Sequence, residues 1–547
     1  MTTVRHSTIP FWISCGEEFL SATWFWPTAG VPQRPLAVLI VPGIAMEDRT
    51  ISVGLMPLAE SLSAAGVPTL LMALEGTGES SGDLSSADIA NSWVTDIQRA
   101  LDHMREVGFA RIVVVAVRLS ALTLLEALPA SAVTGAVLWA PAFSGRRYAR
   151  ELSMLAVTGK AGRLERRADL PVIVGTFPLA ADLLERFKSM KLTLAAAPVS
   201  RILVIDDPER LDNASIENLR LTGATVDVRV GAETASWLYT SSESAAVPRT
   251  DVDAVVDWMT ALAGTPTAQP VRTPSVSASH EFVRDGIRII ERHVRFSRAN
   301  LLGIYATPAD ATTDGSPAWV IVTSVQPGKG FVDFARDEAA RGRPSLRFDL
   351  SSNGLSERRK RQGWGELNGR YGPIDAALAA DWMQPAHPVL SLLGFCSGAI
   401  ASINVAPRAA VRNIVAINPP VFIPKHSWRT SDGRSGSAFW KAVDKVDTRR
   451  IGGRLRWKFR RDWFRWSPSL HLLTLHRRRG TRVLLQYDDV DPGWVYLRRV
   501  FSKSLSLTGK DRTIEVSLYT DIDHLLDRPE GRKQVMADAL AFGSRTE

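Results

Sequence analysis

Cysteine is scarce in this chain, and long apolar runs are absent. Only Cys15 and Cys396 occur among the 547 residues, too few for a disulfide framework and without the spacing of a metal site. No apolar stretch approaches the roughly 18 residues of a membrane span, and residues 1–30 lack the continuous apolar core of a secretion signal. We therefore expect a cytoplasmic protein with no bound metal and no cofactor.

Positive charge is unevenly distributed. The formal net charge is +9, yet thirteen Lys and Arg lie between residues 441 and 479 against three Asp. The rest of the chain is close to neutral, so the basicity belongs to one segment. Nothing else in the sequence resembles a nucleic-acid module, and we expect no nucleic-acid partner.

The chain repeats one plan. Residues 59–66 (AESLSAAG) match residues 335–342 (ARDEAARG) at an offset of 276, and residues 137–141 (VLWAP) match residues 415–419 (VAINP) at an offset of 278. Residues 59–66 and residues 335–342 each predict a helix that ends at glycine and is followed by an apolar strand and a Gly/Ser-rich turn. Several matches in one order at nearly constant offset indicate a duplicated unit.

Short apolar runs alternate with amphipathic stretches in both halves. This pattern predicts an α/β fold, with a mostly parallel sheet flanked by helices in each half. Residues 263–279 are rich in Pro, Thr and Ser and have no periodicity, which is typical of a linker. The predicted domains are residues 1–262 and residues 280–547.

The most informative motif is GFCSG at residues 394–398, between the apolar runs 389–393 and 399–403. A strand that turns sharply into a helix at such a motif forms a nucleophile elbow, in which flanking glycines permit the turn. Cys396 is then the candidate nucleophile. The alternative is a small buried cysteine in a tight turn.

Both halves resemble the α/β-hydrolase superfamily. Over residues 319–420 and 480–526 the chain is similar to tandem hydrolase-like proteins of bacterial polysaccharide gene clusters. The resemblance implies two tandem α/β-hydrolase domains, each with a helical cap insertion. It also implies a catalytic triad in the order nucleophile, acid, histidine.

The resemblance assigns the remaining site residues of the second half. Strand 482–487 precedes an acidic loop in which Asp491 best matches the family's D-P-G pattern, with Asp488 and Asp489 as rivals. His524 follows strand 514–519 and is the expected general base. The backbone amides of Ser397 and of the loop around Ser324 and Val325 are the expected oxyanion donors.

The first half has lost these features. Its elbow position reads AVRLS, so Arg118 stands where the nucleophile belongs, and Ser120 occupies the position of the second glycine. No histidine lies between the elbow and the linker, which excludes a triad within this half and predicts a pseudo-enzyme. Two interpretations of Arg118 stay open: it binds an anionic group, or it forms a salt bridge with Glu126 or Glu75.

An insertion of about 60 residues, 420–480, is expected to form the cap of the second half. Within it, residues 449–466 interleave Trp and Phe with Arg and Lys. Three alternatives remain: an ordinary cap helix, a contact with the inner face of the membrane, or a lining for an anionic or lipid-linked acyl substrate.

Together these features predict an enzyme that hydrolyses a small-molecule or lipid-linked ester or thioester through an acyl intermediate on Cys396. The same triad would also serve an acyltransferase. A function of another class, a non-catalytic scaffold or regulator in an envelope-polysaccharide pathway, is the second alternative.

Overall fold

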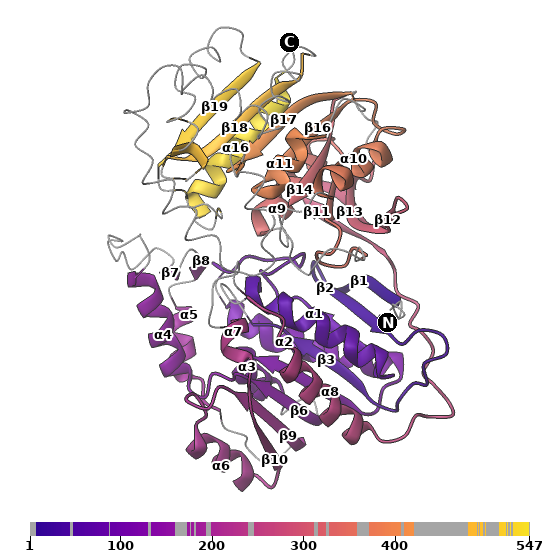
Figure 1. The fold of residues 1–547 in the computed structure, drawn as a ribbon, viewed down its shortest axis with the longest axis vertical. Coiled ribbons are helices and arrows are strands. Elements are labelled where there is room, and N and C mark those ends of the chain that lie inside the picture. The colour runs from indigo at the N-terminus through magenta and orange to yellow at the C-terminus, as the bar shows by residue number, and fades with distance from the viewer. Residues whose placement is uncertain are drawn as a thin grey trace, which may run out of the picture. The chain divides into compact units, whose positions relative to one another are not determined.

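Two large β-sheets, one in each half of the chain, organise the computed structural model (Figure 1). The chain divides into a first unit, Met1–His280, and a second unit, Glu281–Glu547. The residues that the structure describes are 7–43, 48–86, 88–128, 133–158, 172–174, 177–179, 182–192, 199–238, 245–310, 316–323, 328–357, 371–405, 410–420, 480–489, 491, 493–495, 498, 513–520, 522, 526 and 529–545.

The first sheet has the strand order β1-β2-β4-β3-β5-β6-β9-β10. The β1–β2 and β2–β4 pairs are antiparallel, and the later pairs are parallel. The strands are β1 (Ser7–Cys15), β2 (Glu18–Trp26), β3 (Ala37–Val41), β4 (Thr69–Met72), β5 (Ile112–Val117), β6 (Val133–Trp139), β9 (Val199–Asp206) and β10 (Thr225–Val230), with a separate pair β7 (Val172–Val174) and β8 (Phe177–Leu179). The helices are α1 (Asp48–Ala64), α2 (Ile89–Val107), α3 (Ser120–Ala127), α4 (Gly145–Thr158), α5 (Leu183–Ser189), α6 (Asn213–Leu221), α7 (Thr234–Leu238) and α8 (Arg249–Ala263).

The second sheet has the order β11-β12-β13-β15-β14-β16-β17-β18-β19. Its strands are β11 (Ser279–Arg284), β12 (Ile287–Phe296), β13 (Leu301–Pro308), β14 (Ala318–Thr323), β15 (Ser345–Asp349), β16 (Leu390–Phe395), β17 (Val411–Ile417), β18 (Arg482–Asp488) and β19 (Ile514–Tyr519). The described helices are α9 (Lys329–Ala340), α10 (Gly372–Met383), α11 (Ser397–Ile403) and α16 (Pro529–Ser544).

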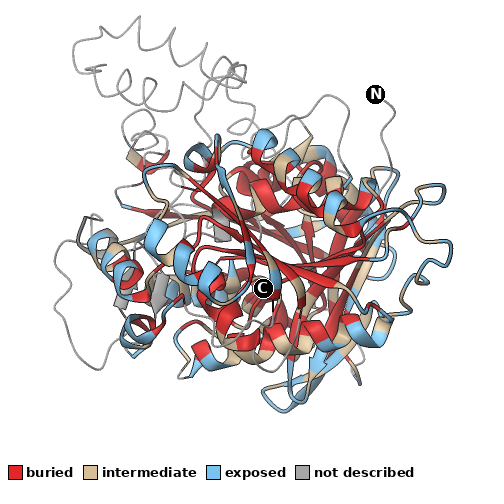
Figure 2. Cartoon of the chain, turned by 90° about the horizontal axis from the view of Figure 1, so that it is seen from below, coloured by how far each residue is buried: buried red, intermediate tan, exposed pale blue. Residues whose placement is uncertain are grey.

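The two sheets share one topology. Counted from β1 and from β12, each runs 1-2-4-3-5-6-7-8 with an antiparallel second strand. In the first unit α1 packs with α7 and α8, and α2 packs with α3; in the second unit α9 packs with α16, and α10 packs with α11. Figure 2 shows central strands that are buried and helices whose outward faces are exposed, as expected where helices cover both faces of a parallel sheet. The α/β fold and its tandem arrangement are confirmed.

The duplication extends to unusual backbone angles. Arg118 and Cys396 both have positive φ, 56° and 51°, and so do Ala140 and Asn418, at 48° and 46°. Residues other than glycine rarely adopt a positive φ, because their Cβ atom then crowds the backbone. Two such matches at the sequence offset of 278 indicate that both units retain one set of strained turns.

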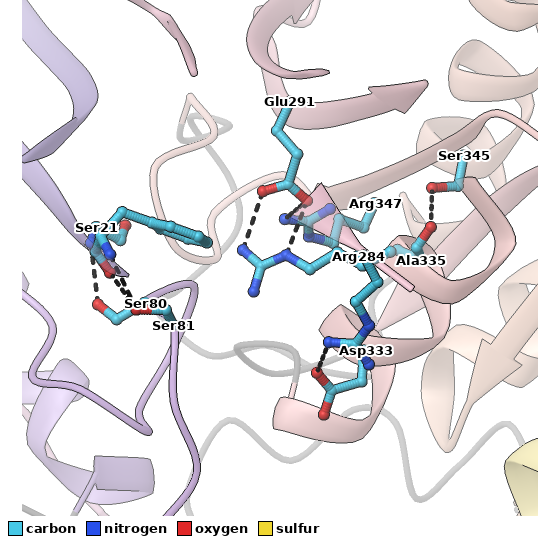
Figure 3. Close-up of polar contacts among 11 residues, drawn as sticks. Ser21, Ser80, Ser81, Arg284, Glu291, Asp333, Ala335, Ser345 and Arg347 are labelled. Carbon is cyan, nitrogen blue, oxygen red and sulfur yellow. Dashed lines mark hydrogen bonds and ion pairs between the residues drawn. The ribbon is translucent and has the colours of Figure 1, made fainter. Parts of the chain in front are cut away.

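A serine bridge is repeated as well. The hydroxyl of Ser80 accepts the amide of Ser21 at 2.9 Å (Figure 3), and the hydroxyl of Ser356 accepts the amide of Leu302 at 2.9 Å. Each hydroxyl also donates to a carbonyl at the end of the neighbouring β4 or β15, at 2.8 and 2.6 Å. In each unit these hydrogen bonds join the antiparallel second strand, β2 or β13, to the turn that follows the strand beside it, β4 or β15.

A buried carboxylate is repeated beside that turn. Asp96 on α2 accepts the amide of Glu75 at 2.8 Å, and Asp375 on α10 accepts the amide of Ser351 at 2.8 Å. Burial raises the pKa of Asp96 to about 7, with Glu75 and Glu18 acting in the same direction and the Glu75 amide and Arg99 opposing them.

This pKa predicts a pH dependence of stability. Because the folded protein holds a proton on Asp96 that the unfolded chain has released, the free energy of unfolding falls as pH rises from about 4 to 7. An Asp96→Asn variant keeps an oxygen for the Glu75 amide and cannot ionise. The free energy of unfolding of this variant, relative to that of wild type, is therefore expected to rise between about pH 4 and 7, by at most about 4 kcal/mol. Urea unfolding of both proteins at pH 5, 6, 7 and 8 tests this; a difference that stays constant with pH would contradict it.

The segment predicted as a linker, residues 263–279, lies at the end of the first unit. Helix α8 ends at Ala263, and Arg111 donates to the carbonyls of Leu262 and Ala263 at 2.7 and 3.2 Å. Further along, Val271 and Val276 pack against the apolar core of the first unit. Residues 264–278 form no helix or strand, and part of the segment is attached to the first unit.

Candidate active site

Cys396 lies at a sharp turn between β16 and α11. Its φ and ψ are 51° and −119°, a conformation that costs energy for a residue with a side chain. The amide of Cys396 donates to the carbonyl of Ile417 on β17 at 2.9 Å, and its own carbonyl accepts the amides of Ala399 and Ile400 in the first turn of the helix. The predicted strand–turn–helix context of the motif is confirmed, and the Cys396 side chain is partly exposed.

Both glycines of the motif lie where the backbone is closely packed. A Cβ on Gly394 would lie 2.5 Å from the carbonyl oxygen of Gly398. A Cβ on Gly398 would overlap the carbonyl of Val322 on β14. The helix therefore begins in direct contact with the ends of two strands, which holds Cys396 at the edge of the sheet.

The expected oxyanion donors are only partly described. Ser397 is the first residue of α11, and amides in the first turn have no acceptor within their own helix. Strand β14 ends at Thr323 and pairs with β16, so that Val322 lies opposite Gly394. Ser324 and Val325 come next in the chain and lie outside the described residues.

The three candidate acids differ in burial. Asp489 is exposed, whereas Asp488 and Asp491 are buried. Asp491 accepts the amide of Gly493 at 2.7 Å, and the amide of Asp488 donates to the side chain of Asn418 at 3.2 Å. These contacts leave Asp491 and Asp488 as acids held in place at the end of β18, and Asp491 stays the predicted member of the triad.

His524 lies outside the described residues, but its neighbours in sequence are informative. Ile522 and Leu526, two residues to either side, are both 2% exposed. They belong to the apolar cluster that contains Phe395, and Cys396 packs against the same cluster. Ile522 and Leu526 are thus both buried in the cluster to which Phe395 belongs.

A polar network behind the two loops was not anticipated from the sequence. Gln486 on β18 donates to the Tyr519 hydroxyl at 2.6 Å and to the carbonyl of Val535 at 2.9 Å. The Tyr519 hydroxyl donates to Asp538 on α16 at 2.7 Å, and burial raises the pKa of Tyr519. The network joins the strands that precede the acidic loop and the histidine loop. The sequence signal for this network is Gln486, a polar residue within a mostly apolar strand.

The first unit keeps the elbow but not its glycines. Arg118 has positive φ, Ala116 stands at the first glycine position, and Ser120 begins α3 at the second. The hydroxyl of Ser120 donates to the carbonyl of Pro42, directly after β3. Ser120 is therefore buried in the start of the helix.

Arg118 forms an ion pair across the former site. It is 5% exposed, and its guanidinium lies 3.0 Å from Glu151 on α4 and 5.4 Å from the ring centre of Tyr148. Arg210, from the loop after β9, lies 3.6 Å from the same oxygen of Glu151. The salt-bridge interpretation of Arg118 holds with a different partner than expected, since Glu126 pairs with Arg186. The sequence could not indicate Glu151, because α4 lies beyond the repeated core strands.

No helix among the described residues is long and apolar enough to cross a membrane. Among the same residues no group of His, Cys, Asp and Glu could hold a metal ion. Most of the predicted cap 420–480, including the basic aromatic segment 449–466, lies outside the described residues.

Comparisons with known proteins find likeness in structure but not in sequence. No protein-family model matches the sequence, and no curated protein matches it. Est1E from Butyrivibrio proteoclasticus is 16% identical, with a TM-score of 0.32 over 46% of this chain and 98% of its own. A serine hydrolase without a lid from Xanthomonas campestris is 13% identical, with a TM-score of 0.29 over 49% and 99%. An esterase from Pyrococcus furiosus is 13% identical, with a TM-score of 0.30 over 46% and 91%.

These likenesses are weak, and the topology of the chain itself defines the fold of each unit. Each unit has the strand order 1-2-4-3-5-6-7-8, and each has a residue with positive φ directly after its fifth strand. In this fold, that position is the nucleophile elbow. The chain therefore has two domains in tandem with the α/β-hydrolase fold, and the second has a cysteine at its elbow position.

Proposed function

We propose that the second unit hydrolyses an ester or thioester through Cys396, His524 and Asp491. The observation that carries the proposal is the backbone of Cys396, a non-glycine residue held at φ 51° and ψ −119° between β16 and α11. Such strain persists where the surrounding structure enforces it, and it concentrates at functional sites.

The chemistry follows from the three side chains. His524 takes the proton of the Cys396 thiol, and the sulfur attacks the substrate carbonyl to give a tetrahedral oxyanion. The amide of Ser397 donates to that oxyanion. The intermediate collapses as the leaving alcohol or thiol takes the proton from His524, leaving an acyl thioester on Cys396.

The second half of the reaction regenerates the thiol. Water attacks the thioester as His524 accepts its proton, the carboxylic acid leaves, and the proton returns to sulfur. Asp491 orients the imidazole throughout and stabilises its charged form. An alcohol or amine in place of water would make the enzyme an acyltransferase with the same residues.

Intact-mass spectrometry tests the proposal directly. The full chain is incubated briefly with p-nitrophenyl acetate or with a longer acyl thioester, beside a Cys396→Ala variant. We expect one acyl adduct on wild type, located in residues 394–398 and lost in the variant, because only Cys396 has an activating base. Decay of the adduct with and without an amine or sugar acceptor separates hydrolysis from transfer.

Cys15 supplies the internal control. Burial raises the pKa of the Cys15 thiol, so its thiolate is scarce and it should stay unlabelled at neutral pH. No adduct on wild type, or equal labelling of Cys15 and Cys396, would contradict the proposal and leave a scaffold or regulator as the function to pursue.

A further inference from the structure

Two serines of α11, Ser397 and Ser402, have buried hydroxyls without a hydrogen-bond partner in the part of the chain that the structure describes. Most buried hydroxyls in folded proteins have a partner, because burying one without compensation is costly. Each of these two therefore needs a physical reason.

The surroundings of the two serines differ. Ser402 is 0% exposed and lies beneath β16, since a Cβ on Gly394 would come within 2.6 Å of its hydroxyl oxygen. It is enclosed between the strand and the helix, away from any approaching molecule. Ser397 instead follows Cys396 directly and begins α11.

The position of Ser397 places its hydroxyl near the reacting atoms. Within one serine the amide nitrogen and the hydroxyl oxygen are three bonds apart, so they lie only about 3 Å from each other. An oxygen atom that accepts the Ser397 amide is thus within reach of the hydroxyl after rotation about χ1. That rotation breaks no hydrogen bond, because the hydroxyl makes none in its buried position.

We propose that the Ser397 hydroxyl is a catalytic donor, which binds the carbonyl oxygen of the substrate as negative charge develops on it. This inference rests on the proposed function and extends it from the Ser397 amide to the Ser397 side chain. The hydroxyl keeps its proton throughout and forms no covalent bond. Its hydrogen bond strengthens as the carbonyl becomes an oxyanion, which favours the transition state over the substrate.

The test compares three variants of the full chain by their rate of acylation with p-nitrophenyl acetate, followed by intact mass. Ser397→Ala is expected to slow acylation on the order of tenfold to a hundredfold, without loss of thermal stability. Ser397→Thr keeps the hydroxyl and should recover most of the rate. Ser402→Ala removes the matched buried hydroxyl of the same helix and should leave the rate within about twofold.

The outcomes separate this inference from the function beneath it. Wild type without an adduct would reject the proposed function itself. Wild type with an adduct and Ser397→Ala at an equal rate would overturn the role of the hydroxyl alone. Equal slowing by Ser397→Ala and Ser402→Ala would also overturn it, because the effect would then come from packing of α11.

Discussion

Replacing Gly398 with alanine is expected to slow acylation of Cys396 on the order of a hundredfold while the chain still folds. The new Cβ overlaps the carbonyl of Val322, and a backbone atom cannot rotate aside as a side chain can. Helix α11 must move away from β14, and it carries the Ser397 amide with it. Overpacking of this kind costs about 1–3 kcal/mol of stability, which a domain with a large core tolerates.

The first unit shows that an elbow with a side chain at this position can fold. Ser120 stands at the position of Gly398, its hydroxyl reaches the carbonyl after β3, and Arg118 still has positive φ. A side chain at this position is therefore compatible with the fold. What it should disturb is the close contact between helix and strand that the oxyanion donors require.

A nearby glycine provides the control. A Cβ on Gly372, at the start of α10, would have Ala401 and Leu350 as nearest neighbours, at 3.5 and 3.9 Å, which is ordinary van der Waals contact. Gly372→Ala should therefore acylate at the wild-type rate. The measurement is the acylation rate of both variants beside their thermal unfolding. If Gly398→Ala kept the wild-type rate, the close contact would have no catalytic role.

The elbow and the duplication were predictable because both leave a pattern in the sequence itself. The motif at residues 394–398 lies between two apolar runs, and the repeat consists of matching segments at a nearly constant offset. Both features are present in the structure.

The contacts that depend on packing between distant segments could not be predicted. Arg118, directly after β5, forms its ion pair with Glu151 on α4, and no periodicity relates the two residues. Composition predicted a linker at residues 263–279 but not the packing of Val271 and Val276 on the first unit. Burial of Gln486 with Tyr519 likewise depends on how α16 covers the sheet.

Replacing Glu291 with glutamine is expected to lower the stability of the second unit by about 3–5 kcal/mol. Glu291 on β12 is 0% exposed and binds two buried arginines, Arg336 on α9 at 2.9 Å and Arg347 on β15 at 2.7 Å (Figure 3). Glutamine has nearly the same shape, so the loss is electrostatic: the two guanidiniums lose the negative charge that they share. Burial makes this loss large, because water cannot replace the carboxylate.

An exposed ion pair of the same unit supplies the comparison. Asp310 pairs with Arg288 at 2.7 Å, yet their side chains are 73% and 53% exposed, so solvent screens the interaction. Asp310→Asn should unfold at the wild-type urea concentration, whereas Glu291→Gln should unfold well below it. Hydrogen exchange of peptides from α9 and β15 locates the loss, since both arginines lie there. Equal midpoints for the two variants would show that the buried cluster contributes no more than a surface pair. A loss of stability in Glu291→Gln alone would show that the buried cluster holds α9 in place. Phe331 of this helix packs against Phe395, the residue before Cys396, with 5.4 Å between the two ring centres.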